Sequence, residues 1–117
     1  MKQFSYTKHS EAKALELVKR DGFAIQYIHN PSETVKMAAV QQDGYNIKYI
    51  PNPSEAVQLA AVQQEGYLIH HINSPSEAVC LAAIQQNEDA ILYIHDEQMV
   101  ETICEKLGIE FIIEEMK

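Results

Sequence analysis

The sequence predicts a solenoid, a fold in which short units of secondary structure stack one after another. The first observation is a 22-residue repeat: segment 30–45 recurs as 52–67 and, with more changes, as 74–87. The second is that weaker copies begin near Lys8 and at Asp96. A short fixed period over a whole chain is typical of stacked-repeat folds. We therefore expect one repeat domain over residues 1–117, built from the five units 8–29, 30–51, 52–73, 74–95 and 96–117.

Each unit opens with residues that favour the start of a helix. In the third unit, Asn52 is expected to cap the helix, because an asparagine side chain accepts from the free amides of a first turn. Pro53 then takes the first helical position and Glu55 the third, from which its carboxylate can reach back to the cap. The corresponding residues are Asn30, Pro31 and Glu33, then Ser74, Pro75 and Glu77, and in the last unit the cap Asp96.

A glycine follows the predicted helix in three units. Glycine is common at this position because it readily adopts the left-handed conformation that ends many helices. We expect a different turn in the fourth unit, where a glutamate replaces it. The helices are expected to end at Gln42, Gln64 and Gln86, and the residues that follow the helices of the first four units are Gly22, Gly44, Gly66 and Glu88.

A second, six-residue element follows each helix, and the residues alone do not decide its type. Segment 45–49 alternates in the manner of a strand and is rich in β-branched and aromatic residues. In the first unit, however, Phe23, Tyr27 and Ile28 have the spacing of a short helix. Six residues are too few for the period to decide, so helix and strand both stay open. In the fifth unit this element is expected over 109–114.

On a helical wheel, the internal helices are apolar on two sides. In the second unit Val35 and Ala39 lie on one side, and Met37 and Val40 lie on the other. Such a helix must be covered on both sides, which suits an interior layer of a stack. The end units each keep one apolar half, so we expect them to cap the stack. Their apolar residues are Leu15, Leu17 and Val18 in the first unit and Val100, Ile103, Cys104 and Leu107 in the last.

Charge is distributed unevenly along the chain. The net charge is −8, but residues 1–48 carry seven Lys/Arg against five Asp/Glu, whereas residues 49–117 carry two against twelve. Binding to phosphates needs clustered cations, so we expect no direct contact with nucleic acid or an anionic membrane. A partner with a basic surface is compatible with this charge. The chain has neither an apolar run of membrane-spanning length nor a secretory signal, and we expect a cytoplasmic protein.

No catalytic or cofactor-binding motif accompanies the repeats. His29 and His95 share a repeat position but are three layers of about 10 Å apart, too far to hold one metal ion. Cys80 is expected on the outer side of its helix, with no cation nearby to lower its pKa, and Cys104 in the core. Both are expected as reduced thiols. We therefore expect a protein without enzymatic activity, metal or cofactor.

The repeat resembles a known family of short helical repeats. The pattern Asn-Pro-Ser-Glu-x-Val-x-x-Ala-Ala-Val-x-Gln-x-Gly-Tyr-x-Ile-x-Tyr-Ile, over about residues 8–95, is similar to repeats of bacterial and phage proteins that are catalogued as a domain of unknown function. The resemblance implies an all-α fold, a short solenoid of right-angle-type helical pairs with five 22-residue repeats and degenerate capping repeats at both ends. A strand-plus-helix α/β solenoid is the alternative. The resemblance implies no activity and no catalytic residues.

Two sets of side chains are candidates for contact with a partner. A ladder of identical side chains on one face is how repeat proteins build extended binding surfaces. We expect Gln42, Gln64 and Gln86 to bond between layers instead, and the repeated tyrosines to pack mainly in the core. The candidates are Gln41, Gln63, Gln85 and Gln58 on the repeat helices and Glu97, Glu101 and Glu105 at the acidic C-terminal end.

These features predict a non-enzymatic, monomeric protein-binding module that uses its repeat face or its acidic C-terminal end to bind another protein. The alternative is an acidic, phage-derived inhibitor that imitates nucleic acid and occupies the basic groove of a nucleic-acid-binding protein. A third hypothesis is an assembly module whose ends stack between copies.

Overall fold

A computed structural model describes residues 8–108 of the chain, and every element in that range is helical. The all-α prediction is confirmed and the strand-plus-helix alternative is wrong. The second element of each of the first four units is a 3₁₀ helix, labelled η; that of the fifth unit, expected over 109–114, lies outside the described residues. In order, the elements are α1 (Lys8–Arg20), η1 (Gly22–Tyr27), α2 (Glu33–Gln42), η2 (Gly44–Tyr49), α3 (Glu55–Gln64), η3 (Gly66–His71), α4 (Glu77–Gln86), η4 (Glu88–Tyr93) and α5 (Glu97–Leu107).

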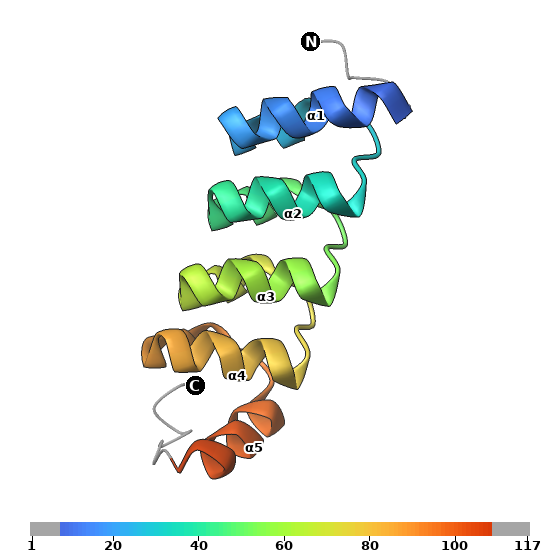
Figure 1. The fold of residues 1–117 in the computed structure, drawn as a ribbon. Helices are drawn as coiled ribbons and strands as arrows, with labels where there is room; N and C mark the ends of the chain where they lie inside the picture. The colour runs from blue at the N-terminus through green and yellow to red at the C-terminus, as the bar shows by residue number, and fades with distance from the viewer. Residues whose placement is uncertain (1–7, 109–117) are drawn as a thin grey trace.

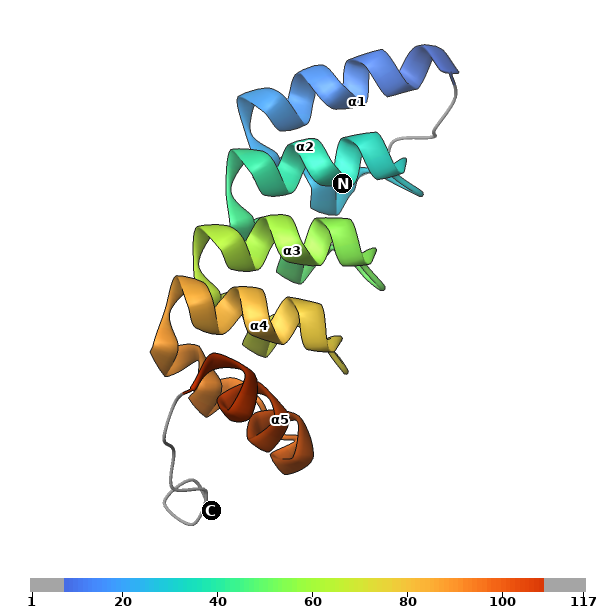
Figure 2. The ribbon, with the colours of Figure 1, turned by 60° about the horizontal axis from the view of Figure 1, so that its bottom comes forward.

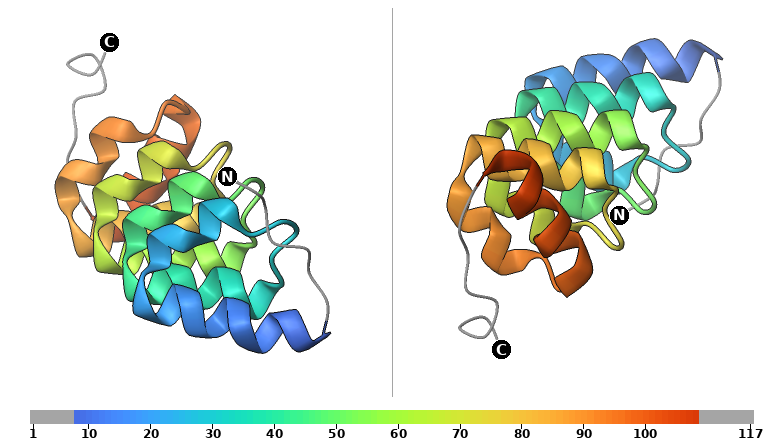
Figure 3. Two further views of the ribbon diagram at one scale, coloured as in Figure 1. Left: turned by 90° about the horizontal axis from the view of Figure 1, so that it is seen from above. Right: turned by 90° about the horizontal axis from the view of Figure 1, so that it is seen from below.

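The units stack in chain order into an elongated body with principal extents of 51 × 20 × 18 Å. Helices α1 to α4 lie side by side in one layer, and the shorter η helices form a second layer behind them (Figure 1). The view rotated by 60° shows the same order, with α5 turned away from the direction of the other four (Figure 2). Seen along the stack, α5 crosses its end (Figure 3).

The caps of the internal helices differ from the prediction. The side chains of Ser32, Ser54 and Ser76, rather than those of Asn30, Asn52 and Ser74, accept from the third amide of α2, α3 and α4. Residues 30, 52 and 74 lie two positions earlier at φ values of 50°, 51° and 49°. There the chain turns from an η helix into the next repeat, a left-handed conformation that asparagine tolerates. Only Asp96 caps its helix as predicted, by accepting from the amide of Met99.

The internal glycines serve close packing and do not end the helices in a left-handed conformation. Each begins an η helix and lies against the following repeat. A Cβ atom on Gly66 would lie 2.2 Å from the carbonyl oxygen of Ala83, and one on Gly22 would lie 2.8 Å from that of Ala39. Within the described residues the left-handed glycine is Gly108, at φ 66°, after α5.

Two hydrogen-bond ladders connect the layers. In the first, Gln42 Oε1 accepts from the amide of Gly22 at 3.0 Å and Gln64 Oε1 from that of Gly44 at 2.8 Å. Gln86 repeats the contact on Gly66. The predicted bonding of these glutamines between layers is thus confirmed, with glycine amides as donors and, for the Gln64 side-chain amide, the Val40 carbonyl as acceptor at 2.6 Å.

In the second ladder, a glutamate in the first turn of α1, α2 and α3 accepts from the serine that caps the next helix. Ser32 donates to Glu11 at 2.8 Å and Ser76 to Glu55 at 2.6 Å. Ser54 makes the equivalent bond to Glu33. The glutamates therefore bond between repeats and do not reach back to their own caps.

The core repeats with the same period. Each internal α helix buries a valine, an alanine and a further β-branched residue, as Val35, Ala39 and Val40 do in α2. Each η helix and the residue after it add two isoleucines, such as Ile25 and Ile28. The end units keep one apolar side, as predicted. Helix α1 buries Ala14 and Val18 and exposes Lys13 and Glu16; α5 buries Val100 and Ile103 and exposes Glu97, Glu101 and Glu105.

Candidate protein-binding surface

The predicted glutamine candidates fall into two environments. Gln41, Gln63 and Gln85 are exposed on α2, α3 and α4. Gln41 lines a shallow groove of about 500 Å³ on the α layer, together with Met37 and Ala38. Gln58, in contrast, is half-buried, and its side-chain amide donates to the carbonyl of Pro53 at 2.9 Å. The structure therefore leaves the first three available to a partner and holds Gln58 within its own repeat.

The acidic candidates form a single exposed row on α5. Glu97, Glu101 and Glu105 are spaced by four residues, which places them along one face of the helix. None of the three forms an ion pair with another residue in the described range 8–108. This surface carries negative charge without internal compensation.

Cys80 does not lie on an outer face as predicted. It is fully buried, because its helix position faces the loop that precedes the helix, where its Sγ approaches the carbonyl of Pro75 at 4.0 Å. Burial raises the pKa of the Cys80 thiol to about 11, and the charges of Asp96 and Glu77 add to the effect. Burial also raises the pKa of Cys104, which is half-buried. Both cysteines are free thiols.

The most exposed large apolar side chains of the described residues all lie on the η helices. They are Phe23, Tyr27, Tyr45, Leu92 and Tyr93, with between 37% and 57% of each residue exposed. The prediction that the tyrosines pack mainly in the core is therefore wrong for three of them, while Tyr49 and Tyr67 are half-buried. A 3₁₀ helix has three residues per turn, so burying Ile25 and Ile28 on one line leaves the neighbouring positions outside.

The rings of adjacent repeats contact one another in pairs. We define the aromatic row as Phe23, Tyr27, Tyr45, Tyr49, Tyr67 and Tyr93. Within it, the ring centroids of Phe23 and Tyr49 are 5.1 Å apart and those of Tyr45 and Tyr67 are 5.8 Å apart, both edge to face. Such pairs are favourable and fix the orientation of each ring.

Two histidines of the third repeat extend the ring contacts to the repeats on either side. The ring of His70 lies 5.5 Å from that of Tyr93, and the ring of His71 lies 6.5 Å from that of Tyr45. Partial burial lowers the pKa of His71, and the neighbouring charges of His70 and Lys48 act in the same direction. At any pH above the usual pKa of histidine, the His71 ring in this surface is therefore neutral.

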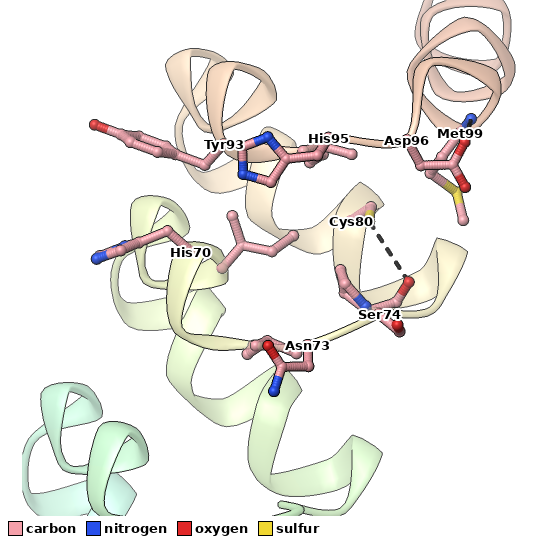
Figure 4. Close-up of a pocket in the computed structure, with 12 residues that line it drawn as sticks. His70, Asn73, Ser74, Cys80, Tyr93, His95, Asp96 and Met99 are labelled. Atoms are coloured by element: carbon pink, nitrogen blue, oxygen red, sulfur yellow. Dashed lines mark hydrogen bonds between the residues drawn. The ribbon is translucent and has the colours of Figure 1, made fainter.

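A groove opens at the edge of the aromatic row, where the chain passes from each η helix to the next α helix. Its volume is about 490 Å³. His70, Asn73 and Ser74, at and before the turn into α4, face Tyr93, His95 and Asp96, at and before the start of α5, and Cys80 lies at the inner end (Figure 4). The shorter Cys80 side chain takes the position that Gln58 fills one repeat earlier.

The groove recurs with the period of the repeat. One unit earlier, a groove of about 460 Å³ is lined by Lys48, Tyr49, Asn52, His71 and other residues of the corresponding loops. The aromatic row is thus accompanied by similar hollows in successive layers.

Carboxylates follow the other edge of the η layer, at the turns between each α helix and the following η helix. Asp21 and Asp43 each accept from the second amide of the η helix that they precede, at 3.1 and 3.0 Å, which fixes their side chains beside Phe23 and Tyr45. We define the carboxylate row as the exposed residues Asp21, Asp43, Glu65, Glu88 and Asp89.

The described residues offer neither a metal centre nor a membrane-spanning helix. Residues 8–108 contain no group of three or more histidine, cysteine, aspartate or glutamate side chains arranged to hold a metal ion. None of the helices in that range is both long and apolar enough to cross a bilayer.

Comparison of the chain with protein-family models, curated proteins and solved structures found no match. Over residues 8–108 the chain is all-helical and built from regularly spaced units, and in each of the first four an α helix is followed by a 3₁₀ helix.

Proposed function

We propose that this chain is a non-enzymatic protein-binding module and that its partner docks on the aromatic row. The observation that carries the proposal is the location of the exposed large apolar side chains, which in the described residues are confined to the η helices. Tyrosine and phenylalanine are enriched at protein interfaces and often provide most of the binding energy. Four successive helices that present such residues on one side form a surface suited to a partner.

The contacts between the rings support the proposal. A side chain that is already held by its neighbours loses less conformational freedom when a partner binds. Phe23 packs on Tyr49, and the Tyr45 and Tyr67 hydroxyls are hydrogen-bonded to each other. The surface is therefore arranged before the partner arrives.

The chemistry of the edge groove favours binding over covalent catalysis. Cys80 lies at the inner end of this groove, and a cysteine can act as a nucleophile. The pKa of Cys80, about 11, keeps it as a thiol at neutral pH. The thiolate, and not the thiol, is the reactive form of cysteine. The resemblance to bacterial and phage repeats, for which no activity is implied, is compatible with a binding role.

The second candidate function is that of an acidic inhibitor that imitates nucleic acid. Its support is the uncompensated row Glu97, Glu101 and Glu105, together with the balance of two Lys/Arg against twelve Asp/Glu in residues 49–117. Regularly spaced carboxylates on a helix can occupy a basic groove that otherwise binds phosphates. This function would use α5 and not the aromatic row.

One capture experiment separates these surfaces. The tagged chain is incubated with a lysate of the source cells, and captured proteins are quantified by mass spectrometry for the wild type and three triple variants. The variants change Tyr27, Tyr45 and Tyr93 to Ala; Gln41, Gln63 and Gln85 to Ala; and Glu97, Glu101 and Glu105 to Gln. We expect to find a protein that the tyrosine variant captures at least about tenfold less than the wild type does, as for loss of several interface aromatics. The glutamine variant should capture the same protein as well as the wild type does.

The three variants are matched in number and alter exposed side chains, and circular dichroism verifies that each remains helical. A partner lost only with the glutamate variant, and displaced by added salt, would instead support the acidic inhibitor. Capture that none of the variants changes would refute docking on the aromatic row.

A further inference from the structure

We infer that the aromatic row binds an extended segment rich in arginine or lysine, which lies along the stack and places one cation in each layer between the rings and the carboxylate row. The inference rests on the proposed function and specifies the chemistry of the partner. Three features of the η layer support it: its charge, its own cation–ring contact and its spacing.

Charge complementarity is the first feature. Within each of the first three repeats the carboxylate lies two residues before an aromatic ring of the row, as Asp43 does before Tyr45. The hydrogen bond from the Tyr45 amide to Asp43 Oδ1 fixes this carboxylate, and Asp21 is fixed in the same way beside Phe23. Arginine and lysine pair with carboxylates and also pack on aromatic faces, so both halves of each pair can contact the same cation.

The second feature is a cation already present on the row. The ammonium group of Lys48 lies over the ring of Tyr49, 5.1 Å from its centroid. This contact shows that a ring of the row can present its face to an ammonium group. A guanidinium group of a partner would make the same contact, with greater area, on the more exposed rings of Tyr45 and Tyr93.

The third feature is the spacing of equivalent positions. Packed helices lie about 8–10 Å apart, so identical positions recur along the stack at about that interval. A polyproline II helix advances about 3.1 Å per residue with three residues per turn, so every third side chain recurs after about 9 Å. An extended segment with a cation at every third residue therefore meets one carboxylate and one ring in each layer.

The same charges disfavour single-stranded nucleic acid. Exposed aromatic rings stack on bases in many single-strand-binding proteins, but those proteins pair the rings with cations that bind phosphates. Here the exposed Asp21, Asp43 and Glu65 each lie two residues before a ring of the row and would repel a phosphate backbone.

The test uses fluorescein-labelled peptides and fluorescence anisotropy with the full chain. The probe is (Pro-Pro-Arg)4, which is about 37 Å long as a polyproline II helix and offers one arginine to each of the four η helices. Two controls change one property each: (Pro-Pro-Glu)4 inverts the charge, and (Pro-Pro-Pro-Arg)4 keeps four arginines but places them about 12 Å apart. We expect saturable binding of the probe, about tenfold weaker binding of the wider-spaced peptide and none of the acidic peptide.

A matched pair of variants tests the location. Asp21→Asn, Asp43→Asn and Glu65→Gln together remove three charges from the carboxylate row. Asparagine keeps the turn, because Asn87 already accepts from the amide of Asp89 at the equivalent place in η4. The matched control variant combines Glu97→Gln, Glu101→Gln and Glu105→Gln and removes three charges from α5. We expect the first variant to weaken binding of (Pro-Pro-Arg)4 about tenfold, as for three partly exposed ion pairs, and the second to change it less than twofold.

Three outcomes would overturn the inference: equal binding of the two arginine peptides, equal weakening by the two variants, or tighter binding of an oligouridine than of (Pro-Pro-Arg)4. Its failure is distinguishable from that of the proposed function. If no arginine peptide binds while the tyrosine variant still loses its partner from the lysate, docking on the aromatic row stands and the basic extended segment is wrong. If no arginine peptide binds and the tyrosine variant still captures every protein that the wild type captures, then the basic segment and docking on the aromatic row are both wrong.

Discussion

The junctions within the stack α1–α4 and the junction between α4 and α5 are built differently. Within the stack, a glutamine accepts from a glycine amide of the preceding repeat and a capping serine donates to its glutamate, as Gln86 and Ser76 do. At the last junction Glu88 replaces the glycine, and Gly108 and Gln98 occupy the glutamine and serine positions. Lys106 instead forms an ion pair with Glu77, whose serine partner is missing. The junction at which the helix direction changes is therefore also the one that lacks the repeated polar contacts of the stack.

The apolar residues of α5 explain why it turns. Its buried residues Val100 and Ile103 are equivalent to Ala78 and Leu81, which α4 leaves exposed or half-buried. Three of the four buried positions of α4, those of Val79, Ala83 and Ile84, become charged in α5. Helix α5 can bury its own stripe only after rolling and crossing the end of the stack (Figure 3). The outer side of α5 carries Glu97, Glu101 and Glu105, so this helix lacks the second apolar side of the internal helices.

The largest effect is expected from Gly66→Ala. The new Cβ would lie 2.2 Å from the backbone oxygen of Ala83, and neither backbone can move without separating the third and fourth repeats. We expect the free energy of unfolding, measured by urea denaturation, to fall by about 3 kcal/mol, as for a severely overpacked site. Glu88→Ala is the matched control at the last junction, where the position already carries a side chain, and a loss below about 0.5 kcal/mol is expected. Equal losses would show that the glycines have no special packing role.

This position also shows what the sequence could and could not predict. The period, the helices and the one-sided end units follow from spacing within a unit, and the structure confirms them. The role of Gly66 depends on Ala83 of the next repeat, which no local pattern contains. A glycine after a helix is more often a left-handed cap, so the local interpretation was wrong.

The helix caps and the candidate site were missed for related reasons. Asn30 and Ser32 are both good capping residues, and the choice between them depends on the chain turning at Asn30 with φ 50°. The aromatic row was missed because six residues do not reveal a 3₁₀ helix. Its signal was present: Ile25 and Ile28, three apart, recur as isoleucines in the next three repeats, which leaves the aromatic residues between them for the outside.

A smaller effect is expected from Gln64→Ala, which removes two bonds between repeats. The amide of Gly44 and the carbonyl of Val40 both lose their partner, and each such loss costs about 1 kcal/mol. We expect the free energy of unfolding to fall by about 2 kcal/mol. The neighbouring Gln63→Ala removes an exposed side chain of the same type and should change it by less than about 0.5 kcal/mol. If the two variants are equally stable, the glutamine ladder does not hold the layers together.

Ser54→Ala should cost about 1 kcal/mol, since it removes a helix cap. The Ser54 hydroxyl accepts from the amide of Val57 and donates to Glu33, so the variant weakens both its own helix and the contact with the preceding one. Ser54→Asp separates the two roles, because aspartate caps equally well but repels Glu33. Urea denaturation should place the aspartate variant between the wild type and the alanine variant at pH 7 and 50 mM salt. An aspartate variant as stable as the wild type would mean that the bond to Glu33 contributes nothing.

The smallest effect is expected at the last junction, from Lys106→Met. Lys106 and Glu77 are both partly exposed, with 54% and 37% of their side chains accessible, and such ion pairs contribute less than about 1 kcal/mol. Methionine keeps the apolar stem and removes the charge, so the free energy of unfolding should fall by about 0.5 kcal/mol at low salt and by less at 1 M salt. The bonds of Gln64 within the stack join uncharged groups, so salt should leave the loss in Gln64→Ala unchanged. A salt-independent loss in Lys106→Met would show that packing of the stem, and not its charge, holds α5 across the end of the stack.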